Sequence, residues 1–145
     1  MAIVIEAAHP DDFDTILALL ERSGLPEAGL RDHRDCLLVA RIDGELAGCA
    51  GLELYGQSAL LRSVAVEAAH RGKSVGRCLT DAALLLARAH GVGRVYLLTT
   101  TAAEFFAALG FEPVDRAAVP AAVQTSAEFR GACPDSARAM VRALV

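Results

Sequence analysis

The chain has 145 residues, a length typical of one domain, and we predict a single domain over residues 1–145. Hydrophobic residues make up 54% of it and charged residues 22%, which is enough apolar sequence to bury a sizeable core. The net charge of −4 argues against a nucleic-acid partner, which would need a basic patch. No apolar run reaches the roughly eighteen residues of a membrane span, so no membrane partner is expected.

The first elements are a strand and a helix. Residues 3–8 alternate weakly, as a short strand does. His9-Pro10-Asp11-Asp12 then offers the residues that begin helices, and apolar residues recur at helical spacing from Phe13 to Leu20. Gly24 ends this helix. We expect residues 25–34 to be a loop with one irregular turn.

Three strands follow in succession, at residues 36–42, 46–55 and 58–66. Asp43-Gly44 and Gly56-Gln57 are the hairpin turns between them, so neighbouring strands are antiparallel. Nearly every strand position is apolar, which predicts that both faces of the sheet are covered.

The second half alternates helices with strands. Val75, Leu79, Ala83 and Leu86 lie on one helical face, in a helix that runs to about His90. The further predicted elements are a strand at 95–99, a helix at 102–109, a strand at 111–116, and a long connection at 117–136 with a helical turn opened by Pro120. The pattern of residues 137–144 fits a strand or a helix, and we take it as a last strand.

Four cysteines, Cys36, Cys49, Cys78 and Cys133, contain no CxxC pair. Their spacing matches neither a zinc site nor a disulfide framework. We therefore predict buried or half-buried free thiols, no metal, and a cytoplasmic location, where thiols stay reduced.

The segment from Arg71 to Gly76 enters the long helix through a glycine-containing turn. Such a turn presents free backbone N–H groups and the positive end of the helix dipole, which together bind phosphate. Arg71 and Lys73 add positive charge. The alternative is an ordinary helix start, with Ser74 as its N-cap and a solvated basic turn.

This segment resembles motif A of the GNAT acetyltransferases, Q/R-x-x-G-x-G/A, which it matches at Arg71 and Gly76 and departs from at Ser74. Residues 104–111, EFFAALGF, resemble motif B of the same family. The resemblance covers nearly the whole chain. It implies a mixed α/β (α+β) fold, with a seven-stranded, mostly antiparallel sheet that is splayed between strands four and five and flanked by about four helices.

The resemblance also implies an acyltransferase that moves an acetyl group from acetyl-CoA to an amine by direct transfer in a ternary complex. The residues it assigns to the cofactor are Val64, Ala65 and Val66 on the pantetheine, Arg71, Gly72, Lys73, Ser74, Val75 and Gly76 on the pyrophosphate, and Phe105 and Phe106 in motif B. Many family members have a tyrosine where Phe106 stands. Phenylalanine cannot protonate the leaving thiolate, so either another group or water does so, or catalysis is weak.

Several strings resemble, more narrowly, the arsenic-resistance N-acetyltransferase branch. They are residues 51–56, 60–66 and 97–102, and Glu128-Phe129 followed by Cys133-Pro134. This resemblance implies a detoxifying enzyme or a partner in arsenic resistance. A site of three thiols for arsenic is possible in principle, although cysteines packed in the core are the simpler interpretation.

Glu53 interrupts an apolar strand, where a carboxylate is costly unless it is paired or functional. The hairpin register places it opposite Leu60 and diagonal to Arg62 on one face. Three interpretations stay open. Glu53 is the catalytic base or binds the acceptor, Arg62 binds an anionic group of the substrate, or the two form a structural ion pair. Together they would suit an amino acid, which has an amine and a carboxylate.

The predicted substrate is the amine of a small molecule, with an amino-acid-like or arsenical toxin as the narrower candidate. One alternative is a module that binds CoA with little or no catalysis, and another is a protein N-terminal acetyltransferase. The long connection at 117–136 is expected to shape the acceptor pocket. Its polar groups are Gln124, Thr125, Glu128 and Arg130. A homodimer is possible.

Overall fold

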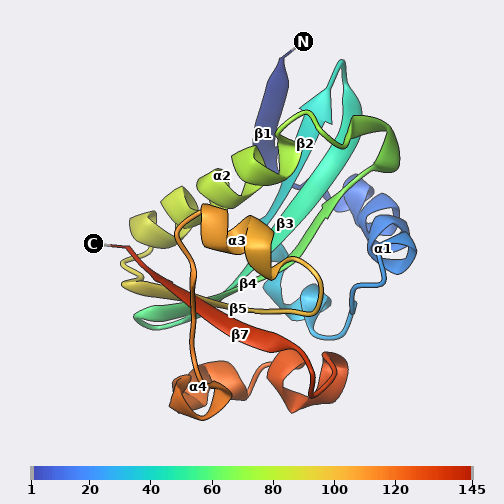
Figure 1. Ribbon diagram of the computed structural model, residues 1–145. Helices are drawn as coiled ribbons and strands as arrows, with labels where there is room; N and C mark the ends of the chain where they lie inside the picture. Colours follow the sequence, from blue (N-terminus) through green and yellow to red (C-terminus); the bar gives the residue numbers. More distant parts are fainter. Residues whose placement is uncertain (1, 145) are drawn as a thin grey trace.

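The computed structural model describes residues 2–144, and within them the strands form one mixed sheet in the order β1-β2-β3-β4-β5-β7-β6 (Figure 1). Every neighbouring pair is antiparallel except β4 and β5, which are parallel. The strands are β1 (Ile3–Ala7), β2 (Leu37–Ile42), β3 (Glu45–Tyr55), β4 (Ser58–Val66), β5 (Arg94–Thr99), β6 (Glu112–Pro113) and β7 (Arg138–Ala143). The predicted seven-stranded mixed sheet is therefore confirmed.

Helices cover both faces of this sheet. The helices are α1 (Phe13–Arg22), α2 (Val75–Ala89), α3 (Ala103–Ala108) and α4 (Ala121–Gln124). Short turns are 3₁₀ at Pro10–Asp12, Leu30–Cys36, Ala68–His70 and Arg116–Ala118, and π at Glu128–Ala132. Adjacent residues of β4 show the two layers, because Leu61 packs with the α2 and α3 core and Leu60 with the residues around α4. Both faces are covered, as the apolar strands predicted.

The sheet opens between β4 and β5. The two strands pair only from Ser58 to Leu60, opposite Arg94 to Tyr96. Beyond Leu60 the two strands separate, although β4 continues to Val66. Ser63 lies in the left-handed region, at φ 59°, and the β3–β4 register shifts nearby. This irregularity turns β4 away from β5, and residues 61–66 of β4 have no β5 partner for their backbone hydrogen-bonding groups on that side. The predicted splay between strands four and five is confirmed.

Two local predictions need correction. The strand expected at 111–116 is reduced to Glu112–Pro113, because Pro113 has no N–H for a ladder and Asp115 then caps a 3₁₀ turn. The turn expected within 25–34 is a 3₁₀ helix that extends to Cys36, so β2 begins one residue later than predicted. The other predicted strands and helices are found close to their expected bounds.

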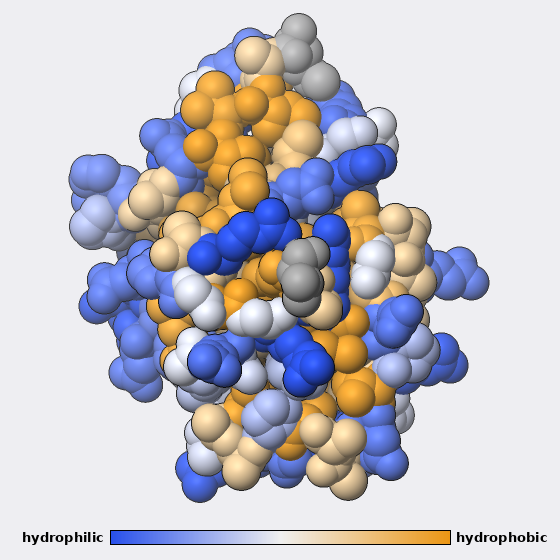
Figure 2. All heavy atoms as spheres, turned by 90° about the vertical axis from the view of Figure 1, so that its left-hand side faces the viewer, coloured by the Kyte–Doolittle hydropathy of each residue, from blue (hydrophilic) through white to orange (hydrophobic). Residues whose placement is uncertain are grey.

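The surface on the C-terminal side of the molecule mixes apolar and charged side chains (Figure 2). Leu85 is 66% exposed and shares a shallow hollow with Asp81, Arg88 and Arg142. Single apolar side chains surrounded by charge are ordinary protein surface. Among the helices of residues 2–144, none combines the length and the apolar character needed to cross a membrane.

Candidate active site

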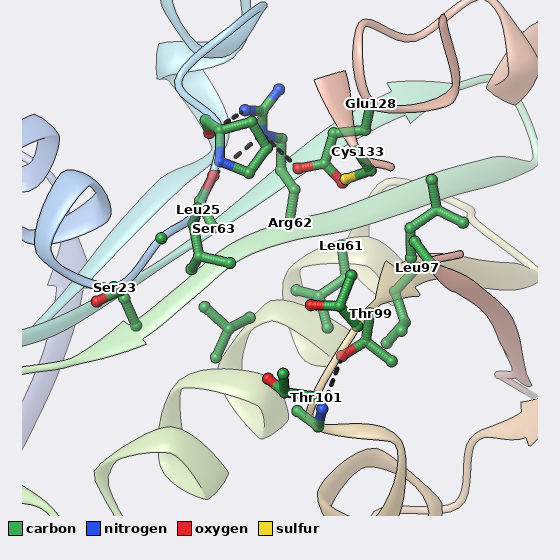
Figure 3. Close-up of a pocket in the computed structure, with 18 of the residues that line it drawn as sticks. Ser23, Leu25, Leu61, Arg62, Ser63, Leu97, Thr99, Thr101, Glu128 and Cys133 are labelled. Atoms are coloured by element: carbon green, nitrogen blue, oxygen red, sulfur yellow. Dashed lines mark hydrogen bonds and ion pairs between the residues drawn. The ribbon is translucent and has the colours of Figure 1, made fainter. Parts of the chain in front are cut away.

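The opening between β4 and β5 forms a cavity of about 460 Å³. The cavity is lined by Leu61 and Val64 of β4 and by Leu97 and Thr99 of β5. Figure 3 shows Leu61 next to Thr99 and Leu97. The remaining sides come from the loop after α1, the start of the α2 turn, α3, and the segment before β7. Their lining residues are Ser23, Gly24, Leu25, Pro26, Arg71, Thr100, Thr101, Ala102, Phe106, Glu128, Ala132, Cys133, Pro134 and Ala137.

A second cavity, of about 390 Å³, lies at the N-terminus of α2 and shares lining residues with the first. The turn that leads into α2 is strongly curved, with φ of 78° at Gly72 and 66° at Ser74. The Ser74 side chain makes no cap hydrogen bond, so the alternative of Ser74 as an ordinary side-chain N-cap is wrong. The Cys78 amide bonds to the Ser74 carbonyl as the helix begins, which leaves the preceding amides available for an anion.

These two cavities suit an extended ligand with a phosphate at one end, and CoA is such a ligand. The unpaired stretch of β4 would hydrogen-bond the pantetheine amides, and the α2 turn would hold the pyrophosphate. Most of the residues predicted for the cofactor line one cavity or both, namely Val64, Ala65, Val66, Arg71, Gly72, Ser74, Val75, Gly76, Phe105 and Phe106. Lys73 is the exception, because it lines neither cavity. Its side chain is exposed, and its Nζ lies 3.4 Å from His70 Nδ1.

The motif B phenylalanines have different environments. Phe105 is 39% exposed and lies against the helix start, where a Cβ added at Gly76 would be 3.2 Å from Phe105 Cζ. Phe106 is buried between Phe105 and Phe111, and it also forms part of the wall of both cavities. Phe106 therefore belongs to the core and to the cavity wall at once.

Glu53 and Arg62 form a fully buried ion pair, with 2.8 Å between Oε2 and Nη1. Glu53 is opposite Leu60 in the β3–β4 register, as the hairpin predicted. Arg62 also donates to the backbone carbonyls of Ala28 and Pro26, at 2.6 and 3.0 Å. The guanidinium thus ties the loop after α1 to the sheet, which is the behaviour of a structural ion pair.

Glu53 faces away from the cavity between β4 and β5. It lines a third, more open cavity of about 540 Å³ on the other side of Arg62. The Tyr55 hydroxyl donates to Glu53, and His33 Nε2 lies 3.4 Å from the same carboxylate. Burial, together with the Glu53 carboxylate, raises the pKa of Tyr55 above its ordinary value. A role for Glu53 as the base stays a prediction, and this geometry does not favour it.

Glu128 is the carboxylate that does reach the main cavity. It is 3% exposed, and its Oε2 lies 3.6 Å from Arg62 Nε (Figure 3). Burial raises the pKa of Glu128 to about 7; Arg62 opposes the rise, while Glu53 adds to it. A carboxyl group that titrates near neutral pH can exchange protons during catalysis.

Cys133 lies beside Glu128 in the cavity wall, and its thiol hydrogen-bonds the carboxylate. Burial, reinforced by Glu128, raises the pKa of Cys133 to about 12, so the thiol stays protonated. Within residues 2–144 all the cysteines are free, and no group of three or more His, Cys, Asp or Glu side chains is arranged to hold a metal ion.

The sequence indicated Arg62 and the connection at 117–136, but not that Glu128 lies beside Arg62. The available signal was an acidic residue in the connection that was expected to shape the acceptor pocket. Its π turn at Glu128–Ala132 crosses back over the sheet face and brings the side chain to β4. The arrangement joins a cofactor-sized cleft to a polar end with one cation and a titrating carboxyl group.

The comparisons with known proteins agree with this geometry. The family model described as an acetyltransferase (GNAT) domain matches residues 33–113. An N-acetyltransferase of Chlorobaculum tepidum is 30% identical over 117 residues, which are 78% of this chain and 74% of that protein. An amino-acid acetyltransferase of Mycobacterium tuberculosis is 36% identical over 81 residues, which are 55% of this chain but only 46% of that protein.

Among solved structures, the N-acetylglutamate synthase of Neisseria gonorrhoeae, complexed with coenzyme A and N-acetyl-glutamate, superposes with a TM-score of 0.87 at 25% identity. The match covers 100% of this chain and 36% of that one, so the chain spans about a third of that enzyme. These matches confirm, at the level of the family, the predicted acyltransferase that uses acetyl-CoA. The chain belongs to the GNAT family of acetyltransferases.

Proposed function

We propose that this chain acetylates the amino group of a small, amino-acid-like acceptor, with acetyl-CoA as the donor. The observation that carries the proposal is the polar end of the main cavity, where buried Arg62 and Glu128 lie next to the unpaired stretch of β4. An amino acid has an ammonium and a carboxylate. Glu128 offers a carboxylate for the ammonium, and Arg62 lines the same cavity as a cation, although its nitrogens already bond Glu53, Ser63 and two backbone carbonyls.

Two relatives support the same class of acceptor. The Mycobacterium tuberculosis protein is an amino-acid acetyltransferase, and the Neisseria gonorrhoeae enzyme was solved with N-acetyl-glutamate. The chain matches only part of each of these proteins, so the acceptor of this chain has to be tested directly.

An amino-acid-like arsenical is a narrower possibility within this class. Its support is the set of strings that resemble the arsenic-resistance branch. The buried, protonated Cys133 does not favour arsenic binding through thiolates, so such an acceptor would be recognised as an amino acid. The predicted cytoplasmic location and homodimer stay predictions.

The test is release of CoA thiol with a panel of acceptors. The panel contains amino acids, the matching amines without the carboxylate, amino-phosphinate analogues and short peptides. We expect at least one amino acid to be used about tenfold more efficiently than its decarboxylated amine, since a well-placed charged partner is worth about 1.4 kcal/mol or more.

Each other outcome contradicts the proposal in a distinct way. Thiol release with peptides alone would indicate a protein N-terminal acetyltransferase. Equal use of amines with and without a carboxylate would remove the amino-acid class. Tight CoA binding without release for any acceptor would indicate a CoA-binding module.

A further inference from the structure

Three buried charged groups meet at the polar end of the main cavity. Arg62 lies between Glu53 and Glu128, with side chains that are 0%, 1% and 4% exposed. The two carboxylates are not equivalent. Glu53 is hydrogen-bonded to Arg62 at 2.8 Å, whereas the Glu128 contact with Arg62 Nε is 3.6 Å and that Nε donates to Ser63 Oγ instead.

One guanidinium cannot balance two carboxylates. When both are ionised, the cluster holds a net negative charge in a region with little solvent, which is costly. The excess belongs to Glu128, because Glu53 already has its partner. A cation that enters the cavity next to Glu128 would restore the balance, and the acceptor's ammonium is a cation of suitable size.

We propose that Glu128 is the catalytic residue that receives the acceptor's ammonium group and takes its proton, an assignment that rests on the proposed function. Glu128 is suited to both steps by its position. It lines the same cavity as Val64, Ala65 and Val66, so it is near the place where the cofactor's reactive end would lie. A carboxylate accepts several hydrogen bonds, and the contact with the Cys133 thiol uses only one of these positions.

The proton balance is simple. The ionised carboxylate of Glu128 takes one proton from the ammonium, which frees the nitrogen lone pair. A C–N bond then forms at the thioester carbonyl as the C–S bond breaks, and the second amine proton leaves with the CoA thiol. The proton on Glu128 returns to solvent through the open cavity. No oxidant or metal is required.

Several groups around Glu128 set the pH at which it ionises. Arg62 on β4 favours the carboxylate, while Glu53 on β3 opposes it. Cys133 donates its thiol hydrogen bond from the segment before β7, and Tyr55 lies on the far side of Glu53 as a neutral group. The active form is the ionised carboxylate, so activity should rise as the pH increases through about 7.

The first test compares wild type with Glu128→Gln in pH profiles of kcat/KM for the acceptor, measured with whichever amine of the panel is used best. We expect the wild-type profile to have a rising limb with its midpoint near pH 7, because burial raises the pKa of Glu128 to about 7. In the variant this limb should disappear, and turnover should fall by about 10²–10⁴-fold with CoA affinity retained. Glu112→Gln, on the exposed strand β6, is the matched control and should keep the limb.

A folded Glu128→Gln variant with turnover within a few fold of wild type and an unchanged limb would overturn the assignment. If the amine that is used best has no carboxylate, the amino-acid class is contradicted. The comparison of wild type with Glu128→Gln on that amine still tests the role of Glu128. The two proposals can therefore fail separately.

A second measurement does not depend on turnover. NMR of protein labelled at the glutamate carboxyl carbons should show one resonance that titrates near pH 7 and is absent from Glu128→Gln. Saturation with a good acceptor should move its midpoint to lower pH, because the ammonium stabilises the carboxylate. A midpoint that no acceptor or simple alkylammonium moves would contradict an ammonium site at Glu128.

Discussion

Replacing Arg62 by methionine is expected to lower the free energy of unfolding by about 3–5 kcal/mol. Methionine fills a similar volume but leaves Glu53 buried without a cation. It also removes the donors to the Ala28 and Pro26 carbonyls, which tie the loop after α1 to the sheet. Denaturant unfolding followed by circular dichroism measures the loss.

Arg94→Met is the matched control, because Arg94 is an exposed arginine on β5. It should change the free energy of unfolding by no more than about 0.5 kcal/mol.

The contribution of Glu128 to the free energy of unfolding depends on pH with a definite sign. Glu128 has a pKa raised to about 7 in the folded chain, so its contribution to stability is present at low pH and is lost as the pH rises through 7. An Arg62→Met loss below about 1 kcal/mol would contradict the structural ion pair.

Replacing Gly72 by aspartate is expected to weaken CoA binding at least tenfold, or about 1.4 kcal/mol. The α2 turn presents backbone amides and the helix dipole to a pyrophosphate, and an added carboxylate repels it. A Cβ at Gly72 has no atom within 4 Å, so the expected loss comes from charge rather than from a clash with the fold. Isothermal titration calorimetry with CoA measures it.

Gly91→Asp is a close control for this variant. Gly91 has the same φ of 78° and equally open surroundings, but it follows the other end of α2. Its backbone strain should therefore match that of Gly72→Asp while CoA affinity stays near wild type. Equal affinities in the two folded variants would contradict the placement of the pyrophosphate at residues 71–76.

Much of the fold follows from local patterns. The Asp43-Gly44 and Gly56-Gln57 turns set the strand register, and that register correctly paired Glu53 with Leu60. The helical spacing from Val75 to Leu86 predicted α2 and its buried face. These features depend on periodicity and turn chemistry within a few residues, so they are visible in the chain itself.

The active-site end of the cavity is different, because long-range packing decides it. Glu128 reaches Arg62, 66 positions earlier in the chain, only because the connection after β6 folds back across the sheet. From the sequence, Glu53 was the candidate base because it was the carboxylate in an apolar strand, with a structural ion pair to Arg62 as the alternative. The sequence could not show that Tyr55, His33 and Arg62 surround Glu53, or that Glu128 lines the main cavity between β4 and β5.

The most direct test of the proposed function follows the acetyl group itself. Acetyl-CoA labelled with ¹³C in the acetyl carbonyl is incubated with the chain and the best amino-acid acceptor, and the product is examined by NMR and mass spectrometry. The proposed function predicts that the label appears in an amide on the acceptor's amino nitrogen, at a rate proportional to the concentration of the protein. Label that remains on CoA or appears only as free acetate, in the presence of folded, CoA-binding protein, would contradict it.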